Sequence, residues 1–244
     1  MPSSSHRPRK RFGQHFLHEK GVLEKLVDAI QPAATDFIVE IGPGEGALTR
    51  YLKTDQLHLI ELDRDLAARL QTDFPGATVH VGDALEFDFA QFPAGMRIVG
   101  NLPYNVSTPL LFHLARFAPQ VCDMHFMLQL EVVDRMVAAH STPAYGRLSV
   151  ALQARFAMKK LFKVAKGAFR PPPKVESAVV RMEPLAWQLP IDEDLLRRAF
   201  SARRKTLRNA LPEIDFEAVG IDPKLRPENL SPEDYARLSM NSIL

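Results

Sequence analysis

The fold of this chain is decided by one stretch, Val39-Glu40-Ile41-Gly42-Pro43-Gly44-Glu45-Gly46-Ala47. The apolar run over residues 37–41 is short and ends in glycines, as expected for a buried strand, and a helix is expected from residue 47 onward. Glycines at such a junction let the backbone approach a ligand closely, and the N–H groups that open the helix face that ligand. The stretch therefore predicts a ligand site where a strand of an α/β protein ends.

Strands and helices alternate on both sides of this stretch. Further strands are expected over residues 58–62, 78–81, 97–100 and 125–130, with helices over 22–30, from 63, over 109–117 and over 132–139. This alternation indicates a doubly wound, mostly parallel sheet. Two late strands, 161–164 and 177–182, flank a proline-rich loop, and short charged helices follow from residue 192. We therefore expect an α/β domain over residues 1–185 and a small all-α domain over residues 190–244.

The composition is that of an ordinary globular protein. The 244 residues are 46% hydrophobic and 25% charged, which excludes a disordered chain and a disulfide-stapled miniprotein. No run of 18 apolar residues occurs, so no membrane-spanning helix is expected. Cys122 is the only cysteine, which excludes an intramolecular disulfide and any multi-cysteine metal site. These features favour a reducing, cytoplasmic location.

Charge is unevenly distributed along the chain. Residues 21–100 carry six basic and 13 acidic side chains, whereas residues 154–208 carry 14 basic and five acidic ones. Clustered Lys and Arg are typical of phosphate-backbone binding, although a solvated face could also carry them. The first 18 residues form a basic arm with no apolar core, so a secretory signal is excluded. A short transit peptide is an alternative to an arm that contacts nucleic acid.

Two acids and the glycine stretch together indicate a nucleoside cofactor. Glu61 ends the next strand, 19 residues after Gly42, where a carboxylate can accept both ribose hydroxyls. Asp83 follows the third strand and could hold an adenine amino group, or could simply cap a helix. The stretch also fits G-x-G-x-x-A, which keeps a nicotinamide cofactor open. Glu40 and Gly46 favour instead the Glu-x-Gly-x-Gly-x-Gly loop of S-adenosylmethionine-dependent methyltransferases.

The segment Asn101-Leu102-Pro103-Tyr104 follows the fourth strand and suits amine methylation. The lone pair of an aromatic amine is delocalised into its ring. Two acceptors, the Asn101 side-chain oxygen and the Leu102 carbonyl, could hold the amine hydrogens and direct that lone pair toward a methyl group. Tyr104 offers a ring for stacking on a base. The alternative is a proline-containing turn with a core tyrosine.

Several motifs occur in an order that resembles a known family. They are Arg11–Leu17 (RFGQHFL), the glycine loop, residues 60–63, 82–84 and 101–109, residues 169–175 (FRPPPKV) and residues 200–209. The chain resembles the bacterial small-subunit ribosomal RNA adenine dimethyltransferases from about Arg11 to its C-terminus. This resemblance implies a Rossmann-like class I methyltransferase domain. His15 departs from the pattern, because the family commonly has Asn at this position.

The resemblance implies a role for each matching residue. The cofactor, S-adenosylmethionine, would be bound by His15, Leu17, Gly42, Gly44, Glu61, Asp83 and Asn101. Catalysis would involve Asn101, Leu102, Tyr104 and Phe169, with the target base sandwiched between the last two. Independently of the resemblance, the basic arm and the later basic cluster predict RNA binding by Arg9, Lys10, Arg11, Arg203, Arg204, Lys205 and Arg208. No metal is expected.

The implied activity is dimethylation at N6 of two adjacent adenosines in the 3′-terminal hairpin loop of small-subunit ribosomal RNA. The implied partner is a pre-assembled small ribosomal subunit, whose biogenesis the protein would aid as a cytoplasmic monomer. Alternatives are a large-subunit methylase that confers macrolide resistance, an assembly factor that mainly binds, and a nicotinamide dehydrogenase. Trp187 is expected to be a packing residue, and His58, His80 and His125 are expected to be structural.

Overall fold

The structure is a computed structural model that describes residues 15–241. By internal contacts, these residues form two compact units. The first unit runs up to Val133 and includes Lys159–Glu183, and the second comprises Asp134–Met158 and the chain from Pro184 onward. This differs from the predicted uninterrupted domain over residues 1–185. The chain leaves the first unit after residue 133 and returns at residue 159.

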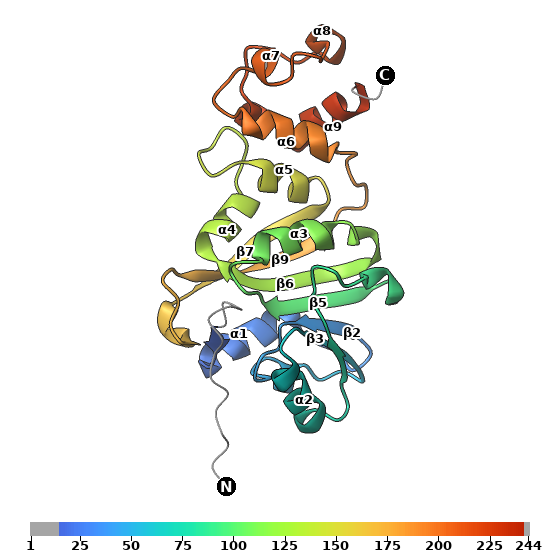
Figure 1. Cartoon of the computed structure of the whole chain (residues 1–244), viewed down its shortest axis with the longest axis vertical. Coiled ribbons are helices and arrows are strands. Elements are labelled where there is room, and N and C mark those ends of the chain that lie inside the picture. Colours follow the sequence, from blue (N-terminus) through green and yellow to red (C-terminus); the bar gives the residue numbers. More distant parts are fainter. Residues whose placement is uncertain (1–14, 242–244) are drawn as a thin grey trace. The chain divides into compact units, whose positions relative to one another are not determined.

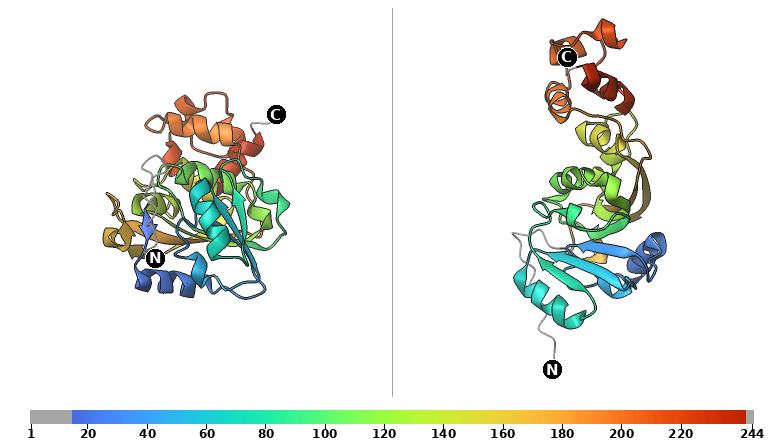
Figure 2. Two further views of the ribbon diagram at one scale, coloured as in Figure 1. Left: turned by 60° about the horizontal axis from the view of Figure 1, so that its bottom comes forward. Right: turned by 90° about the vertical axis from the view of Figure 1, so that its right-hand side faces the viewer.

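A seven-stranded sheet forms the first unit (Figure 1). Its strands are β2 (Phe37–Ile41), β3 (Gln56–Glu61), β4 (Thr78–Val81), β5 (Met96–Asn101), β6 (Val121–Gln129), β7 (Phe156–Val164) and β9 (Ser177–Pro184). The strand order is β4-β3-β2-β5-β6-β9-β7. The five strands β4, β3, β2, β5 and β6 run parallel to one another, and β9 pairs antiparallel with β6. The predicted doubly wound sheet is confirmed, and the turned views in Figure 2 show its twist.

Helices cover this sheet, and a two-stranded ribbon lies beside it. The helices are α1 (Lys20–Ile30), α2 (Arg64–Asp73), α3 (Ser107–Ala115) and α4 (Leu130–Met136), and the ribbon pairs β1 (Phe16–Leu17) with β8 (Phe169–Arg170). Asp63 is the N-cap of α2, because its side chain accepts a hydrogen bond from the Asp65 N–H at 3.0 Å. Among the described helices, none has the length and apolarity needed to cross a lipid bilayer.

One predicted helix is wrong. Instead of a helix from residue 47, the chain forms turns and then a single 3₁₀ turn, Thr49–Tyr51. Gly42, Gly44 and Gly46 all have positive φ, at 66°, 59° and 76°. These left-handed conformations keep the backbone out of the α-helical region up to residue 46.

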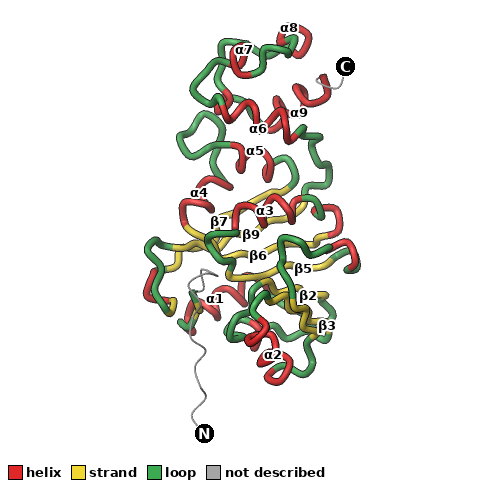
Figure 3. Tube along the Cα trace, viewed as in Figure 1, coloured by secondary structure: helices red, strands yellow, loops and turns green. Residues whose placement is uncertain are grey.

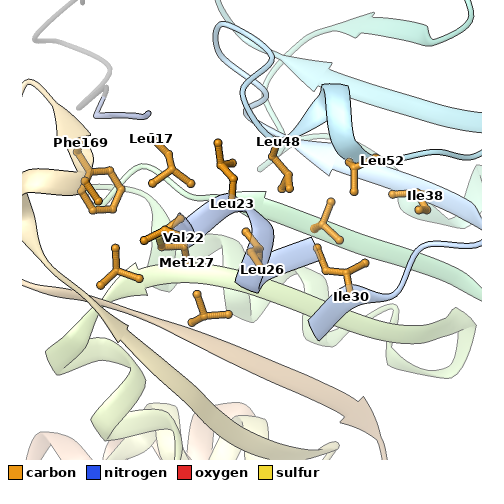
Figure 4. Packing of buried hydrophobic residues seen from close by; sticks show 14 of the residues in the cluster. Leu17, Val22, Leu23, Leu26, Ile30, Ile38, Leu48, Leu52, Met127 and Phe169 are labelled. Carbon is orange, nitrogen blue, oxygen red and sulfur yellow. The ribbon is translucent and has the colours of Figure 1, made fainter. Parts of the chain in front are cut away.

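The core of the first unit is centred on α1 (Figure 4). This helix buries Val22, Leu23, Leu26 and Ile30, the spacing of one helical face. A hydrophobic cluster surrounds that face with residues from the β1–β8 ribbon, the sheet and the loop after β2, among them Leu17, Ile38, Leu48, Leu52, Met127 and Phe169. The segment that precedes α1 and the segment that follows β7 are therefore joined through one core.

The second unit is helical beyond residue 190 in its described part, as predicted (Figure 3). Its helices are α5 (Arg147–Gln153), α6 (Glu193–Ser201), α7 (Leu207–Ala210), α8 (Phe216–Val219) and α9 (Pro232–Asn241). Two buried tyrosines form hydrogen bonds within it. The Tyr145 hydroxyl donates to the Leu230 carbonyl and the Tyr235 hydroxyl to the Pro227 carbonyl, each at 2.9 Å. The expectation that Trp187 packs is wrong, because its side chain is 88% exposed.

Candidate active site

A cavity of about 590 Å³ opens in the first unit where the parallel strands end. The strand order reverses between β2 and β5, and ligands of doubly wound proteins bind outside the carboxyl ends of the strands at such a point. Most of the predicted site residues line this cavity: His15, Leu17, Gly42, Gly44, Glu61, Asp83, Asn101, Leu102 and Tyr104. The fold thus brings together residues that lie up to 89 positions apart (104 − 15 = 89) in the sequence.

The glycine loop lines the cavity through Gly42 and Gly44, and at Gly44 a side chain would not fit. A Cβ on Gly44 would lie 2.9 Å from the Phe16 ring, and Gly44 also has a φ of 59°. Gly46 has a different role. A Cβ there would lie 2.4 Å from the Phe74 ring, and Gly46 is absent from the cavity lining. Gly42 and Gly44 therefore line the cavity, whereas Gly46 leaves room for the C-terminal end of α2 to pack against the loop.

Glu61 is fixed at the end of β3 by two backbone donors. The Gly44 N–H donates to Oε2 at 3.1 Å and the Asp63 N–H donates to Oε1 at 2.9 Å. Burial raises the pKa of this carboxyl, and the two N–H groups partly offset that rise. A carboxylate has about four lone-pair sites. Each oxygen therefore keeps accepting capacity for a ligand, and its orientation is set before the ligand arrives.

Glu40 is a buried acid of the cavity lining to which no role was predicted. Burial raises its pKa to about 8, although the Thr49 hydroxyl donates to its Oε2 at 2.7 Å. The nearby charge of Glu61 raises it further. At neutral pH the Glu40 carboxyl therefore mostly holds its proton, and Glu61, with two backbone donors, is the acid that ionises more readily.

Asp83 lies at the cavity and is held by a local hydrogen bond, although a turn and not a helix follows it. It lines the cavity, and its Oδ1 accepts a hydrogen bond from the Leu85 N–H at 2.9 Å. That bond fixes the carboxylate after β4, as a cap would. The second oxygen, Oδ2, has no such local partner among the described residues and remains available as an acceptor.

Hydrogen bonds hold Asn101, the last residue of β5, and Leu102, which follows it, in defined orientations. The Asn101 Nδ2 donates to the His15 carbonyl at 2.9 Å, which commits the amide nitrogen and leaves Oδ1 as the acceptor. The Leu102 N–H donates to the Met127 carbonyl at 3.1 Å and anchors the turn to β6. These bonds fix two residues of the cavity lining and use neither the Asn101 Oδ1 nor the Leu102 carbonyl.

Tyr104 and His15 meet at the cavity wall. The Tyr104 hydroxyl lies 2.6 Å from the buried Ser177 Oγ, and burial raises the pKa of the phenol. The His15 ring lies 5.4 Å from the Tyr104 ring, centroid to centroid, and its Nδ1 lies 2.7 Å from the Pro171 carbonyl. His15 therefore links the segment before α1, the base-stacking candidate and the loop after β8, all within the first unit.

Phe169 does not reach the cavity. Its side chain is 1% exposed and belongs to the cluster around α1, because pairing of β8 with β1 draws the ring into the core. The predicted sandwich of Tyr104 and Phe169 is not formed in this structure. The cationic residues Arg9, Lys10 and Arg11 lie outside the described residues.

The basic cluster of the second unit does not lie on one helix, because α6 ends at Ser201 and a turn separates it from α7. Arg203 has internal partners there, with its guanidinium 3.7 Å from Glu228 and bonded to the Pro143 carbonyl at 3.0 Å. Arg204, Lys205 and Arg208 are exposed. Among the described residues, no three or more His, Cys, Asp or Glu side chains are grouped so that they could hold a metal ion.

Comparison with known structures confirms the methyltransferase fold. A dimethyladenosine transferase from Plasmodium falciparum superposes with a TM-score of 0.80 at 25% identity, covering 92% of this chain and 96% of that one. The 23S rRNA methyltransferase ErmE superposes with a TM-score of 0.70 at 24% identity, covering 94% of this chain and 100% of that one. At that level of identity, the second likeness shows the shared fold alone.

Sequence relatives match along nearly the whole chain. The Ribosomal RNA small subunit methyltransferase A of Thiobacillus denitrificans is 55% identical over 248 residues, covering 96% of this chain and 97% of the relative. The protein of the same name in Aromatoleum aromaticum is also 55% identical, covering 97% of this chain and 94% of the relative. The sequence profile of the family described as Ribosomal RNA adenine dimethylase matches residues 5–242. The agreement extends from the N-terminal motif to the last described helix, and the chain belongs to the ribosomal RNA adenine dimethylase family.

Proposed function

We propose that the protein transfers methyl groups from S-adenosylmethionine to N6 of two adjacent adenosines in the 3′-terminal hairpin loop of small-subunit ribosomal RNA, two to each base. One observation carries this proposal: Asn101 and Leu102 line the same cavity as the glycine loop and Glu61. The residues predicted to hold the amine and those predicted to hold a nucleoside therefore lie around one cavity. Identity of 55% to proteins named as small-subunit methyltransferases supports this choice of RNA.

The residues of the cavity suit S-adenosylmethionine. Bare backbone at Gly42 and Gly44 leaves room beside the loop, Glu61 can accept ribose hydroxyls and Asp83 Oδ2 can accept from an adenine amino group. Leu17, which is 6% exposed, and His15 line the same cavity from the segment before α1. When bound, S-adenosylmethionine supplies an electrophilic methyl group.

The chain's own residues act on the target amine by orientation. Asn101 Oδ1 and the Leu102 carbonyl accept the two amine hydrogens and direct the nitrogen lone pair into the cavity. The methylated nitrogen is cationic and acidic, so its proton can leave to water without a dedicated base. Tyr104 provides a stacking face for the extruded base. A second face from Phe169 requires its ring to leave the core.

The large-subunit alternative and the binding-only alternative predict different products. The test incubates the protein with labelled S-adenosylmethionine and undermodified small or large ribosomal subunits, and maps the methylated nucleosides. We expect N6-dimethylated adenosines in the small subunit only. Methylation of the large subunit would select the resistance-type activity, and no methylation with intact subunit binding would select the assembly factor. We also propose that the protein acts in the cytoplasm as a monomer.

Asn101→Ala provides the matched control for that assay. It removes the amine acceptor, so we expect methyl transfer to fall by about 100-fold or more. Subunit binding should stay nearly intact, because phosphate contacts on basic surfaces carry most of the affinity. A parallel loss of subunit binding would contradict this division between catalysis and binding.

A further inference from the structure

Five cationic side chains are exposed along β7 and the segment that follows it. They are Lys159, Lys163, Lys166, Arg170 and Lys174, which we name the β7–β8 basic surface. Residues 137–175 contain no Asp or Glu, and no ion pair with another described residue is found for any of the five. These cations were not among the predicted RNA-binding residues. Their charge is therefore available to an external partner.

The segment that carries this surface is anchored in the hydrophobic cluster around α1. Val164, Ala168 and Phe169 are each 1% exposed and pack in the cluster around α1. The His18 N–H donates to the Ala168 carbonyl at 3.0 Å, and Leu17 pairs with Phe169 between β1 and β8. Because the apolar positions are fixed in the core, the cationic positions between them are held at the surface.

The surface begins beside the candidate active site. Arg170 directly precedes Pro171, whose carbonyl lies 2.7 Å from Nδ1 of the cavity residue His15. At the other end, Lys159 and Lys163 are four residues apart on one strand, a span of about 13 Å. A single phosphate cannot contact both lysines. The β7–β8 basic surface therefore suits a polyanion that extends away from the cavity.

A second explanation exists for part of this row. β7 is an edge strand of the sheet, and lysines on edge strands prevent unwanted pairing with other chains. That explanation covers Lys159 and Lys163, which lie within β7. It does not cover Lys166, Arg170 and Lys174, which follow the strand. A partner with regularly repeated negative charge accounts for the whole row.

We infer that the β7–β8 basic surface binds the ribosomal RNA backbone next to the extruded adenosine and guides the target strand into the cavity. The inference rests on the proposed function, because that function supplies the RNA. It assigns phosphate contacts to the catalytic unit itself, in addition to those predicted for the N-terminal arm and the second unit. Such contacts set the register of the strand without reading its bases.

The test measures binding of the full-length chain to undermodified small ribosomal subunits at several salt concentrations. The test variant replaces Lys163, Lys166 and Arg170 by Gln, and the matched control replaces the exposed Lys25, Lys53 and Arg116 by Gln. We expect the slope of log affinity against log salt concentration to fall by about two in the test variant. The control should keep the wild-type slope, and both should keep the wild-type affinity for S-adenosylmethionine.

A third variant separates charge from side-chain identity. Lys163→Arg combined with Lys166→Arg keeps both charges and should keep the wild-type slope. An unchanged slope in the Gln variant would overturn the inference even if the wild-type chain methylates the subunits. Self-association of that variant in sedimentation, with an unchanged slope, would assign the lysines to edge protection. A wild-type chain that binds but does not methylate would overturn the proposed function alone.

Discussion

Glu61 shows how one side chain is prepared for its ligand. Its two oxygens are already held by the Gly44 and Asp63 N–H groups, and each retains accepting capacity. Glu61→Ala removes the ligand acceptor, and a hydrogen bond to a charged group contributes about 1.5–3 kcal/mol. We therefore expect the affinity for S-adenosylmethionine to fall at least about tenfold in calorimetry. Asp73→Ala, at an exposed position of α2, serves as the control, and equal affinity of both variants would remove Glu61 from the site.

Glu40 makes the stability of the fold depend on pH. Its folded pKa of about 8 exceeds the ordinary value of 4.5, so between these values the folded state binds more protons than the unfolded state. The free energy of unfolding then falls as pH rises, by at most about 1.4 kcal/mol per pH unit for one group. Glu40→Gln keeps an oxygen for the Thr49 hydroxyl and cannot ionise.

The measurement for Glu40→Gln is chemical denaturation between pH 6.5 and 8. This window avoids His125, whose burial lowers its pKa to about 4 and whose contribution has the opposite sign between 4 and 6.5. We expect a smaller decrease of unfolding free energy with pH in the variant than in the wild-type chain. Identical slopes would show that Glu40 ionises freely in the folded state.

At the scale of elements, the glycine loop and β1 depend on each other. A Cβ at Gly44 would lie 2.9 Å from the Phe16 ring, and the φ of 59° adds about 1–2 kcal/mol of strain for any other residue. Gly44→Ala should therefore lower the thermal midpoint and weaken binding of S-adenosylmethionine by displacing β1. Gly76→Ala is the control, because no atom lies within 4 Å of its added Cβ and its φ is not positive. Equal midpoints for both variants would contradict this coupling.

The sequence predicts the elements whose signals are local. The apolar run of β2 and the periodic apolar face of α1 can each be recognised within a dozen residues, and the predicted strand and helix are both confirmed. The ribbon of β1 and β8 could not be predicted, because each strand has two residues and exists only through pairing across 152 positions (169 − 17 = 152). The same pairing buries Phe169, which explains why its predicted place at the cavity is wrong for this structure.

At the scale of the whole molecule, the sequence predicts where charge is concentrated but not which charges are already paired. In the second unit, Arg197 and Arg198 pair with Asp194, and Arg198 also pairs with Glu213. Asp194 lies three and four residues before these arginines, the spacing of helical ion pairs, whereas Glu213 lies 15 residues after Arg198 and could not be matched to it from the sequence. Net charge alone therefore overstates how many cations of this unit are available to RNA.

Arg204, Lys205 and Arg208 provide the test of this distinction. They are exposed, and no ion pair with another described residue is found for them, whereas Arg203 is held by Glu228 and the Pro143 carbonyl. Replacing the three exposed residues by Ala should lower the salt slope of subunit binding by about two, because an RNA phosphate without a cationic partner keeps its counterions when the protein binds. Affinity for S-adenosylmethionine should not change.

Arg203→Ala should behave differently because its partners are internal. Its loss leaves the partly buried Glu228 carboxylate without its cation, so we expect a lower thermal midpoint with an almost unchanged salt slope. The two variants therefore separate phosphate binding from maintenance of the helical unit. A large decrease of the salt slope in Arg203→Ala, with an unchanged midpoint, would mean that the guanidinium leaves its internal partners for RNA.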